Sequence, residues 1–502
     1  MRKLLLIGFS TFALGAAAMA SADQLAKPHD SETYKMLELF GDVLVTVKRQ
    51  YVVPVDDKKL IQAAIDGMLT SLDPHSGYLD PTGFGDMREE TAGQYGGLGL
   101  EVTAEDGAVK IISPMDGTPA AKAGLMPGDY ITAIDGNSIV GLGLTDAVKQ
   151  MRGAVGTPIT LTIARERREP FTLKLVREVI EVKTVHSRPI GDYGYLRISA
   201  FDEKTGDETT QALKDLKAKI PHMKGLVLDL RNNPGGLVDS SVEVASDFLN
   251  GGEVVSQRGR EDRDIDRRNA KPDGDLIPGV KVVVLVNNGT ASAAEIVSGA
   301  LKDRQRALVV GLTSFGKGSV QTVIPLRGGA DGALKLTTAR YYTPSGQSIQ
   351  KTGIIPDLQV ARSKEEAEAV SDAALQYSEA SFKNALDSQE GKVRHAPESI
   401  EIPDEKSDAK PEEKDENGKP KPRPLRSAFT LTDEDIAADF QLQRALDVLK
   451  FGGVAQAEAA RPAKVFTLPK PAFAKLEKPA DAPKDGAAKP VDAKPQAAAP
   501  KP

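Results

Sequence analysis

Between residues 171 and 360 the chain alternates short apolar runs with amphipathic segments. The apolar runs are YGYLRISAF, GLVLDL, KVVVLVN and ALVVGL, and the segments between them carry apolar residues at helical spacing. Continuous apolar strands separated by such segments are typical of a sheet that helices cover. The sequence therefore predicts an α/β core for residues 171–360.

The chain before this core divides into two parts. Residues 23–90 carry apolar residues at i, i+3, i+4 and i+7 spacing, which predicts helices. Residues 91–170 hold glycine turns and short alternating strands, which indicates a small β-rich domain. A chain of 502 residues is long enough for several such domains.

After residue 360 the pattern weakens. Residues 361–460 hold helical stretches, and the charged, proline-rich segment 404–424 is interpreted as a solvated linker. Pro, Ala and Lys dominate residues 461–502, which cannot bury enough apolar area to offset the entropy of ordering. We expect this tail to be disordered.

Residues 1–22 have the pattern of a cleaved signal peptide. The basic MRK precedes the apolar run LLLIGFSTFALGAAA, and AMA and ASA both offer small-x-small cleavage sites. The run is too short to span a bilayer comfortably. We expect a periplasmic protein, with an uncleaved, membrane-associated anchor as the alternative.

Composition excludes some kinds of partner and site. A net charge of −6 gives no reason to expect nucleic acid as a partner. The chain has no cysteine, so neither disulfides nor thiolate metal sites are available. We expect neither a metal nor another cofactor. The five histidines lie in no recognisable catalytic triad motif.

A serine stands just beyond the third apolar run of the core. KVVVLVN ends at Asn287, and Ser292 opens the helical segment SAAEIVSGALKD. A serine nucleophile needs a base, and a lysine can serve if burial or a nearby positive charge keeps it neutral. Lys317 lies between two glycines after the apolar run ALVVGL, and Gln321 can hydrogen-bond its amine and fix its direction.

Each of these residues also has an ordinary structural explanation. Serines such as Ser292 commonly cap helices, and lysines between glycines are usually surface turn residues. His75, in the turn LDPHSGYLDP, is interpreted as a hydrogen-bonded turn residue. The 25 positions between Ser292 and Lys317 allow a helix and a strand to bring them together, but spacing alone does not establish contact.

An acyl-transfer site also needs N–H donors for the oxyanion that develops. The segment GLVLDLRNNPGG offers Gly235 and Gly236 after a strand, where bare backbone can face a substrate. The N–H of Ala293, at the start of the next helix, is the second kind of donor. A simple strand-to-helix turn is the alternative explanation for the glycines.

Together these pieces resemble the carboxyl-terminal processing proteases, also called tail-specific proteases. LDPHSGYL (72–79) resembles the helical lead-in of that family, and GGLGLEV (96–102) and GTPAAKAGLMPGDYITAIDG (117–136) resemble its PDZ domain. DLRNNPGG (229–236), ASAAEI (291–296) and FGKGSVQ (315–321) resemble its protease core and stand in family order.

The resemblance implies a multidomain α/β fold and a serine endopeptidase. The expected fold is a crotonase/ClpP-like αβ protease core with an inserted PDZ domain, helical N- and C-terminal regions and a disordered C-terminal tail. The implied roles are nucleophile for Ser292, general base for Lys317, orientation of the lysine for Gln321, and an oxyanion hole from Gly235, Gly236 and Ala293. Ala294 replaces a serine common in the family, which changes none of these roles.

The PDZ resemblance implies a peptide groove. A PDZ domain adds a peptide as an extra strand and catches its terminal carboxylate on backbone N–H groups. Here the donors would be Leu98, Gly99 and Leu100, with Val102 in the wall of the pocket for the last side chain. Arg152 matches a family arginine that couples the PDZ domain to the core, and an ordinary surface role is the alternative.

The resemblance also suggests substrates and partners. We expect a periplasmic peptidase that recognises proteins or peptides with free C-termini and processes or degrades envelope proteins. Family members form homo-oligomers, and some use a helical-repeat adaptor protein. A PDZ scaffold with an inactive or partner-gated core is the alternative, whereas the export signal and the PDZ segment disfavour a crotonase-like acyl-CoA enzyme.

Overall fold

The computed structural model describes residues 31–468, except 106, 116, 166–167, 262, 374–377, 389–396 and 405–431. The predicted signal peptide at 1–22, all but the first residue of the predicted linker at 404–424, and residues 469–502 of the predicted tail lie outside the described residues. None of the described helices is both long and apolar enough to cross a membrane.

The centre of the molecule is a six-stranded sheet in the order β10-β11-β12-β15-β16-β19. From β11 to β19 the strands are parallel, and β10 is antiparallel to β11. The strands are β10 (Val185–Ile190), β11 (Tyr193–Ile198), β12 (Gly225–Asp229), β15 (Lys281–Val286), β16 (Ala307–Gly311) and β19 (Leu358–Gln359). The four apolar runs of the sequence form β11, β12, β15 and β16, as predicted.

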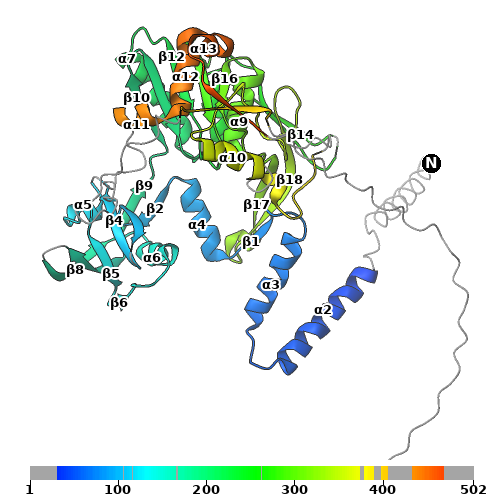
Figure 1. Cartoon of the computed structure of the whole chain (residues 1–502). Coiled ribbons are helices and arrows are strands. Elements are labelled where there is room, and N and C mark those ends of the chain that lie inside the picture. Colours follow the sequence, from blue (N-terminus) through cyan, green and yellow to red (C-terminus); the bar gives the residue numbers. More distant parts are fainter. Residues whose placement is uncertain are drawn as a thin grey trace, which may run out of the picture.

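Helices cover both faces of this sheet (Figure 1). The first face packs on α7 (Thr205–Lys219), α8 (Val238–Ser246) and α9 (Ala293–Asp303), and the second on α12 (Phe440–Phe451). Successive side chains of a strand point to opposite faces. On β12, Leu226 and Leu228 accordingly join the first cluster and Val227 joins the second. Burial on both faces explains why these strands are apolar throughout.

A second, more polar sheet lies beside the first and is built around β18 (Ala333–Tyr342). β18 pairs with β17 (Ser319–Pro325), β1 (Gly77–Leu79) and β13 (Glu253–Arg258), and β13 pairs with β14 (Ile265–Asn269). The short helix η1 (Leu326–Gly329) joins β17 to β18. The N-terminal region is thus paired with the core through β1.

Three helices precede and surround β1. They are α2 (Ser31–Gln50), α3 (Asp57–Thr70) and α4 (Pro81–Thr91). α2 and α3 form a hairpin that projects away from the sheets (Figure 1). In the described part of residues 23–90, which were predicted to be helical, α2, α3 and α4 are helices, whereas Gly77–Leu79 form a strand.

A smaller β domain follows α4. Its sheet has the order β3-β4-β5-β7-β8, with β6 paired to β5. Its elements are β3 (Leu100–Glu105), β4 (Ala108–Pro114), α5 (Pro119–Lys122), β5 (Tyr130–Ile134), β6 (Asn137–Ser138), α6 (Leu144–Met151), β7 (Pro158–Arg165) and β8 (Arg168–Val176). An antiparallel ribbon of β2 (Gln94–Gly97) and β9 (Glu178–Glu181) links it to the core. Its apolar cluster is separate from those of the core.

The C-terminal segments return to the core. They are α10 (Lys364–Ala373), η2 (Glu379–Ser381), β20 (Ser399–Ile402), α11 (Asp433–Ala438), α12, α13 (Val454–Ala460) and β21 (Lys464–Thr467). The prediction of a disordered tail from residue 461 is wrong for its first residues, because β21 pairs with β20. Leu468 and Phe466 pack into an apolar cluster with Ile400, which stabilises this strand.

Candidate active site

Ser292 occupies an unusual backbone conformation at the N-cap of α9. Its φ and ψ angles are 54° and −117°, although an N-cap residue normally has an extended backbone. A non-glycine residue in such a region costs about 1–3 kcal/mol and persists only where its surroundings impose it. The structure therefore contains a strained serine at the end of the loop that follows β15.

The buried carboxylate of Glu295 fixes this serine. Glu295 Oε2 accepts hydrogen bonds from the backbone N–H of Ser292 (2.8 Å) and from the backbone N–H of Lys317 (2.9 Å). Glu295 Oε1 accepts from the hydroxyl of Ser314 (2.5 Å) and the N–H of Gly316 (2.7 Å). One carboxylate thus connects the segment of the proposed nucleophile with the segment of the proposed base.

Complete burial gives Glu295 a perturbed acidity. Burial raises the pKa of its carboxyl to about 7, although the four hydrogen bonds oppose this shift. The motifs of the sequence do not single out Glu295 as a site residue. A glutamate three residues after a serine is the spacing of a capping box, which is a signal that could have identified it.

Lys317 lies in the loop between β16 and β17 and is only partly exposed. Burial lowers the pKa of its amine, and the charge of Lys335 lowers it further. Carboxylates that oppose this shift belong to Glu379, Glu295 and Asp73. The net direction is the one that a general base requires, because it increases the neutral fraction of the amine near neutral pH.

Gln321 follows on β17 and is oriented by hydrogen bonds. Its Nε2 donates to the hydroxyls of Ser319 (3.0 Å) and Thr337 (3.1 Å). Among the described residues, no direct hydrogen bond joins Lys317 to the side chain of Ser292 or Gln321. Glu295 instead joins the loops that carry Ser292 and Lys317, and Gln321 follows Lys317 on β17.

The predicted oxyanion turn lies against the serine. A Cβ atom added to Gly235, whose φ is +101°, would lie 2.8 Å from Cβ of Ser292, so only glycine allows this approach. Asn233 anchors the turn, because its backbone oxygen accepts from the N–H of Ala291 and its side-chain oxygen from the N–H of Gly235, both at 2.9 Å.

The candidate donors of this turn therefore differ in availability. The N–H of Gly235 is already bonded to Asn233. Within the described ranges, the N–H groups of Gly236 and Ala293 donate to no hydrogen-bond acceptor. The geometry favours Gly236 and Ala293 as the donors to an oxyanion, and it gives Gly235 the role of allowing close approach.

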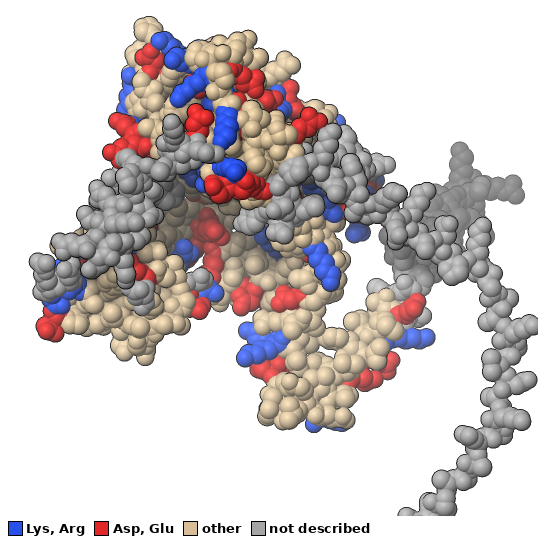
Figure 2. All heavy atoms as spheres, viewed as in Figure 1, with Lys and Arg blue, Asp and Glu red and all other residues tan. Residues whose placement is uncertain are grey.

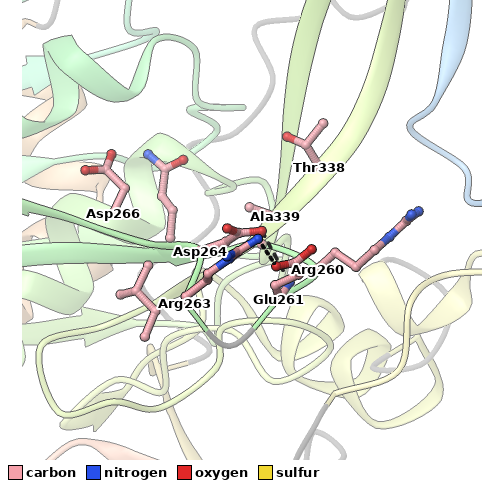
Figure 3. Close-up of a pocket in the computed structure, with 10 residues that line it drawn as sticks. Arg260, Glu261, Arg263, Asp264, Asp266, Thr338 and Ala339 are labelled. Carbon is pink, nitrogen blue, oxygen red and sulfur yellow. Dashed lines mark hydrogen bonds and ion pairs between the residues drawn. The ribbon is translucent and has the colours of Figure 1, made fainter. Parts of the chain in front are cut away.

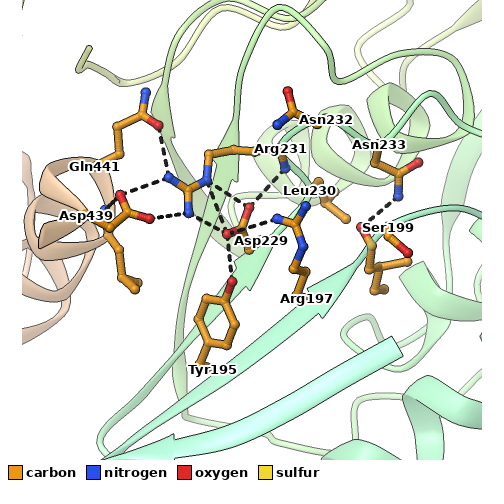
Figure 4. A network of polar contacts seen from close by, with 12 residues as sticks. Tyr195, Arg197, Ser199, Asp229, Leu230, Arg231, Asn232, Asn233, Asp439 and Gln441 are labelled. Carbon is orange, nitrogen blue, oxygen red and sulfur yellow. Dashed lines mark hydrogen bonds and ion pairs between the residues drawn. The ribbon is translucent and has the colours of Figure 1, made fainter. Parts of the chain in front are cut away.

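A buried ionic network holds Arg231, the residue that precedes this turn (Figure 4). Arg231, which directly precedes the turn, bonds to Asp229 Oδ2 (2.6 Å) on β12 and to Asp439 Oδ2 (2.7 Å) before α12. Gln441 and Tyr195 complete the network, and Asp229 is fully buried. The start of the oxyanion turn is thereby attached to the C-terminal helices.

The predicted peptide groove has the required open edge. β3 carries Leu100 and Val102, and it ends its sheet, so its outer edge can accept another strand. Gly99 has a φ of +73° and lies against Thr118, and Leu98 is buried in the domain core. In the described part of the chain, no backbone oxygen accepts from the N–H groups of Leu98 and Gly99.

Arg152 lies at the end of α6 and not at the Ser292 site. Its guanidinium lies 4.3 Å from the ring centroid of Tyr95, a residue of β2. β2 belongs to the ribbon that joins the small β domain to the core. The side chain is therefore placed at the connection between the two domains.

A surface pocket and a metal site are the two other kinds of site that we considered among the described residues. A shallow pocket beside the β13–β14 hairpin is lined by charged residues that bond to one another, such as Arg263 with Glu261 at 2.7 Å (Figure 3). It adjoins Thr338, whereas the site uses the neighbouring Thr337. No group of His, Cys, Asp and Glu side chains suited to a metal ion occurs among the described residues.

Comparisons with known families match three segments. The model of peptidase family S41 matches residues 192–360. The model of the PDZ domain matches residues 110–165. The model described as the activating protease CtpB N-terminal domain matches residues 9–82.

Comparisons with whole proteins agree with these matches. The chain is 52% identical over 362 residues to the carboxy-terminal-processing protease of Bartonella bacilliformis, covering 72% of this chain and 82% of that one. It is 38% identical to the "Probable CtpA-like serine protease" of Staphylococcus epidermidis, covering 64% of this chain and 65% of that one. The solved photosystem II D1 C-terminal processing protease is 32% identical, covers 64% of this chain and 92% of its own, and has a TM-score of 0.39.

Proposed function

Because the chain belongs to the carboxy-terminal-processing proteases, a serine protease family with a PDZ domain, we propose that it cleaves proteins by a Ser-Lys mechanism. In this proposal Ser292 is the nucleophile, Lys317 is the general base and Gln321 orients the lysine. The shared hydrogen-bond acceptor, Glu295 Oε2, is the observation that supports it most strongly.

The proposed reaction proceeds through an acyl-enzyme. The neutral amine of Lys317 takes the hydroxyl proton as Ser292 Oγ attacks the carbonyl carbon of the scissile bond. The N–H groups of Gly236 and Ala293 stabilise the oxyanion. The amide C–N bond then breaks and Lys317 returns the proton to the leaving amine. A water molecule, deprotonated by the same amine, hydrolyses the ester and regenerates Ser292.

We further propose that the PDZ domain selects substrates with free C-termini. A peptide would add to the open edge of β3, and its carboxylate would accept from the N–H groups of Leu98, Gly99 and Leu100. Val102 packs against the domain core and is available to line the pocket for the last side chain. The position of Arg152 over the ring of Tyr95 supports a role in coupling peptide binding by the PDZ domain to the protease core.

The proposed location is the periplasm, where envelope proteins would be the substrates. The basic, apolar and small-residue pattern of residues 1–22 supports export. Removal of the signal peptide would leave the protein free, and retention would anchor it to the membrane.

We also propose that the protein forms homo-oligomers through its N-terminal hairpin. The loop between α2 and α3 exposes Tyr51, Val52 and Val53, and Val52 is 87% exposed. Figure 2 shows a largely uncharged surface at this tip of the hairpin. Exposed apolar groups of this kind mark interaction sites. A helical-repeat adaptor protein is the other partner that could cover them.

The test compares the full-length protein with Ser292→Ala and Lys317→Ala on an unfolded protein substrate. The proposal expects cleavage by the wild type and loss of cleavage in both variants, with PDZ peptide binding unchanged. Equal, slow cleavage by all three would indicate contamination and favour a PDZ scaffold with an inactive core. Full activity of Lys317→Ala would remove the lysine from the mechanism.

A further inference from the structure

The turn Asp73–Ser76, between α3 and β1, reaches into the site from the N-terminal region. Asp73 is only 3% exposed. Its Oδ1 accepts from the N–H groups of His75 (2.8 Å) and Ser76 (2.9 Å), and its Oδ2 accepts from the Ser76 hydroxyl (2.7 Å). Burial alone would raise the pKa of Asp73, but these hydrogen bonds outweigh burial and hold it below its ordinary value. Asp73 is therefore ionised at neutral pH.

A fourth hydrogen bond connects Asp73 with the site. The hydroxyl of Thr337, on β18, donates to Asp73 Oδ1 at 3.1 Å. The same hydroxyl oxygen accepts from Nε2 of Gln321 at 3.1 Å. Thr337 pairs with Gln321 across the β17–β18 ladder, so the backbone holds the two side chains opposite each other.

Because Asp73 is ionised, it fixes which groups donate and which accept in the hydrogen bonds that run from Asp73 through Thr337 to Gln321. An ionised carboxylate can only accept, so the single proton of the Thr337 hydroxyl is used toward Asp73. The Thr337 oxygen can then only accept from Gln321, which must present its NH₂ group. The carbonyl oxygen of the Gln321 amide is consequently directed away from Thr337 and remains able to accept from an amine.

A second series of hydrogen bonds leads from the same turn to Gly318, the residue after Lys317. His75 Nε2 lies 2.8 Å from Oε2 of Glu379, which is 1% exposed. Glu379 Oε1 accepts from Gln350 Nε2 at 2.9 Å, and Gln350 Oε1 accepts from the N–H of Gly318 at 2.9 Å. Gly318 directly follows Lys317, so this chain fixes the backbone that carries the amine.

We propose that the Asp73–Ser76 turn positions the proposed Lys317–Gln321 pair, Asp73 through Thr337 and His75 through Glu379. This inference rests on the proposed Ser-Lys mechanism and adds positioning residues to it. It gives His75 a role beyond that of an ordinary turn residue. It also makes the Asp73–Ser76 turn a structural part of the site, which it reaches through Thr337 and Glu379.

The test measures kcat and KM of the full-length protein on one substrate for matched variants. Thr337→Val removes the hydroxyl and keeps the shape, and Thr337→Ser restores the hydroxyl. Asp73→Ala removes the acceptor, and Asp80→Asn is the control, because Asn caps a helix as well as the exposed Asp80 does. Thr337→Val and Asp73→Ala should lower kcat on the order of 10- to 100-fold at similar KM. Thr337→Ser and Asp80→Asn should retain it.

A double-variant comparison separates positioning from a general loss of structure. If Thr337 acts through Gln321, Thr337→Val should cause no further loss in a Gln321→Ala background. Independent, multiplicative losses would overturn the proposal, as would wild-type kcat in Thr337→Val. His75→Leu should also lower kcat at similar KM. Full activity in that variant would overturn the proposed positioning role of His75 through Glu379.

Failure of this proposal can be distinguished from failure of the proposed mechanism. If Lys317→Ala is inactive while Thr337→Val has wild-type kcat, only the positioning role fails. If Lys317→Ala retains full activity, the Ser-Lys mechanism itself fails. Thermal unfolding of each variant identifies any that has lost its fold, and Thr337→Val keeps the test decisive should Asp73→Ala unfold.

Discussion

The backbone N–H groups of Ser292 and Lys317 donate to the same atom, Oε2 of Glu295, at 2.8 and 2.9 Å. A single buried acceptor therefore sets how closely the loop of the serine approaches the loop of the lysine. The strained φ of Ser292 is maintained in part by this bond.

Glu295→Gln should change how stability depends on pH. Burial raises the pKa of Glu295 to about 7 in the folded protein, above an unfolded value of about 4.3. A raised pKa stabilises the fold below the unfolded value, and this contribution is lost as pH rises through the folded value. Between pH 5 and pH 8 the wild type should lose about 2–3 kcal/mol of unfolding free energy that the variant does not lose.

Denaturant unfolding at both pH values measures this difference. Glu178→Gln is the control, since its carboxylate is half exposed and pairs with Lys122 on the surface. A Glu295→Gln variant whose stability follows the wild type across this range would contradict the assigned acidity.

Charges around Lys317 should shift the pH dependence of activity in opposite directions. Activity should rise with pH as the amine loses its proton. Lys335→Gln removes a charge that lowers the pKa of Lys317, so its profile should move to higher pH. Glu379→Gln removes a charge that raises the pKa, so its profile should move to lower pH.

Profiles of kcat/KM against pH for the two variants and the wild type provide the measurement. The position of the rise is the readout, because Glu379→Gln also disturbs hydrogen bonds and should lower the plateau. Shifts of both variants in the same direction would contradict the electrostatic account.

Arg231→Met should destabilise the fold and weaken the oxyanion turn. It leaves the buried carboxylate of Asp229 and the partly buried carboxylate of Asp439 without their main partner. Breaking a buried pair in this way costs about 3–5 kcal/mol. Lys224→Ala is the control, since its pair with Asp192 is exposed and should contribute little to stability. Equal unfolding free energies of the two variants in denaturant would show that the buried network is unimportant.

Gly99→Ala should weaken peptide binding by the PDZ domain. The new Cβ would lie 2.3 Å from Cβ of Thr118, at a φ of +73°. Gly117→Ala is the matched control, because Gly117 has a φ of +74° and nothing within 4 Å of its Cβ position. Calorimetric titration with a C-terminal peptide should show a loss of affinity in Gly99→Ala well beyond that of the control. Equal affinities would place the carboxylate elsewhere.

The family and the multidomain α/β fold expected from the sequence are confirmed. β12 and β15 were predictable because burial on both faces requires a continuous apolar run. β14 was not, since all five residues of Ile265–Asn269 are exposed and the strand is held by its ladder with β13. No apolar pattern marks such a strand.

The sequence suggests candidate site residues only where they lie in short motifs. Ser292, Lys317 and Gln321 stay predictions, because their roles rest on motif resemblance and on a geometry that brings their segments together. The link from Asp73 to Thr337 could not be predicted, since the two residues are 264 positions apart. Only the pairing of β1 with β18 brings them within hydrogen-bonding distance.

The central claim is that the neutral amine of Lys317 activates Ser292. The most direct measurement is the single-turnover rate of acylation of Ser292 by an ester substrate as a function of pH, for the wild type and Lys317→Ala. We predict that the wild-type acylation rate rises with pH, with a pKa below the ordinary lysine value of about 10.4. In Lys317→Ala we predict that this rise with pH disappears and that most of the acylation rate is lost. A variant that acylates at the wild-type rate with an unchanged pH profile would contradict the account.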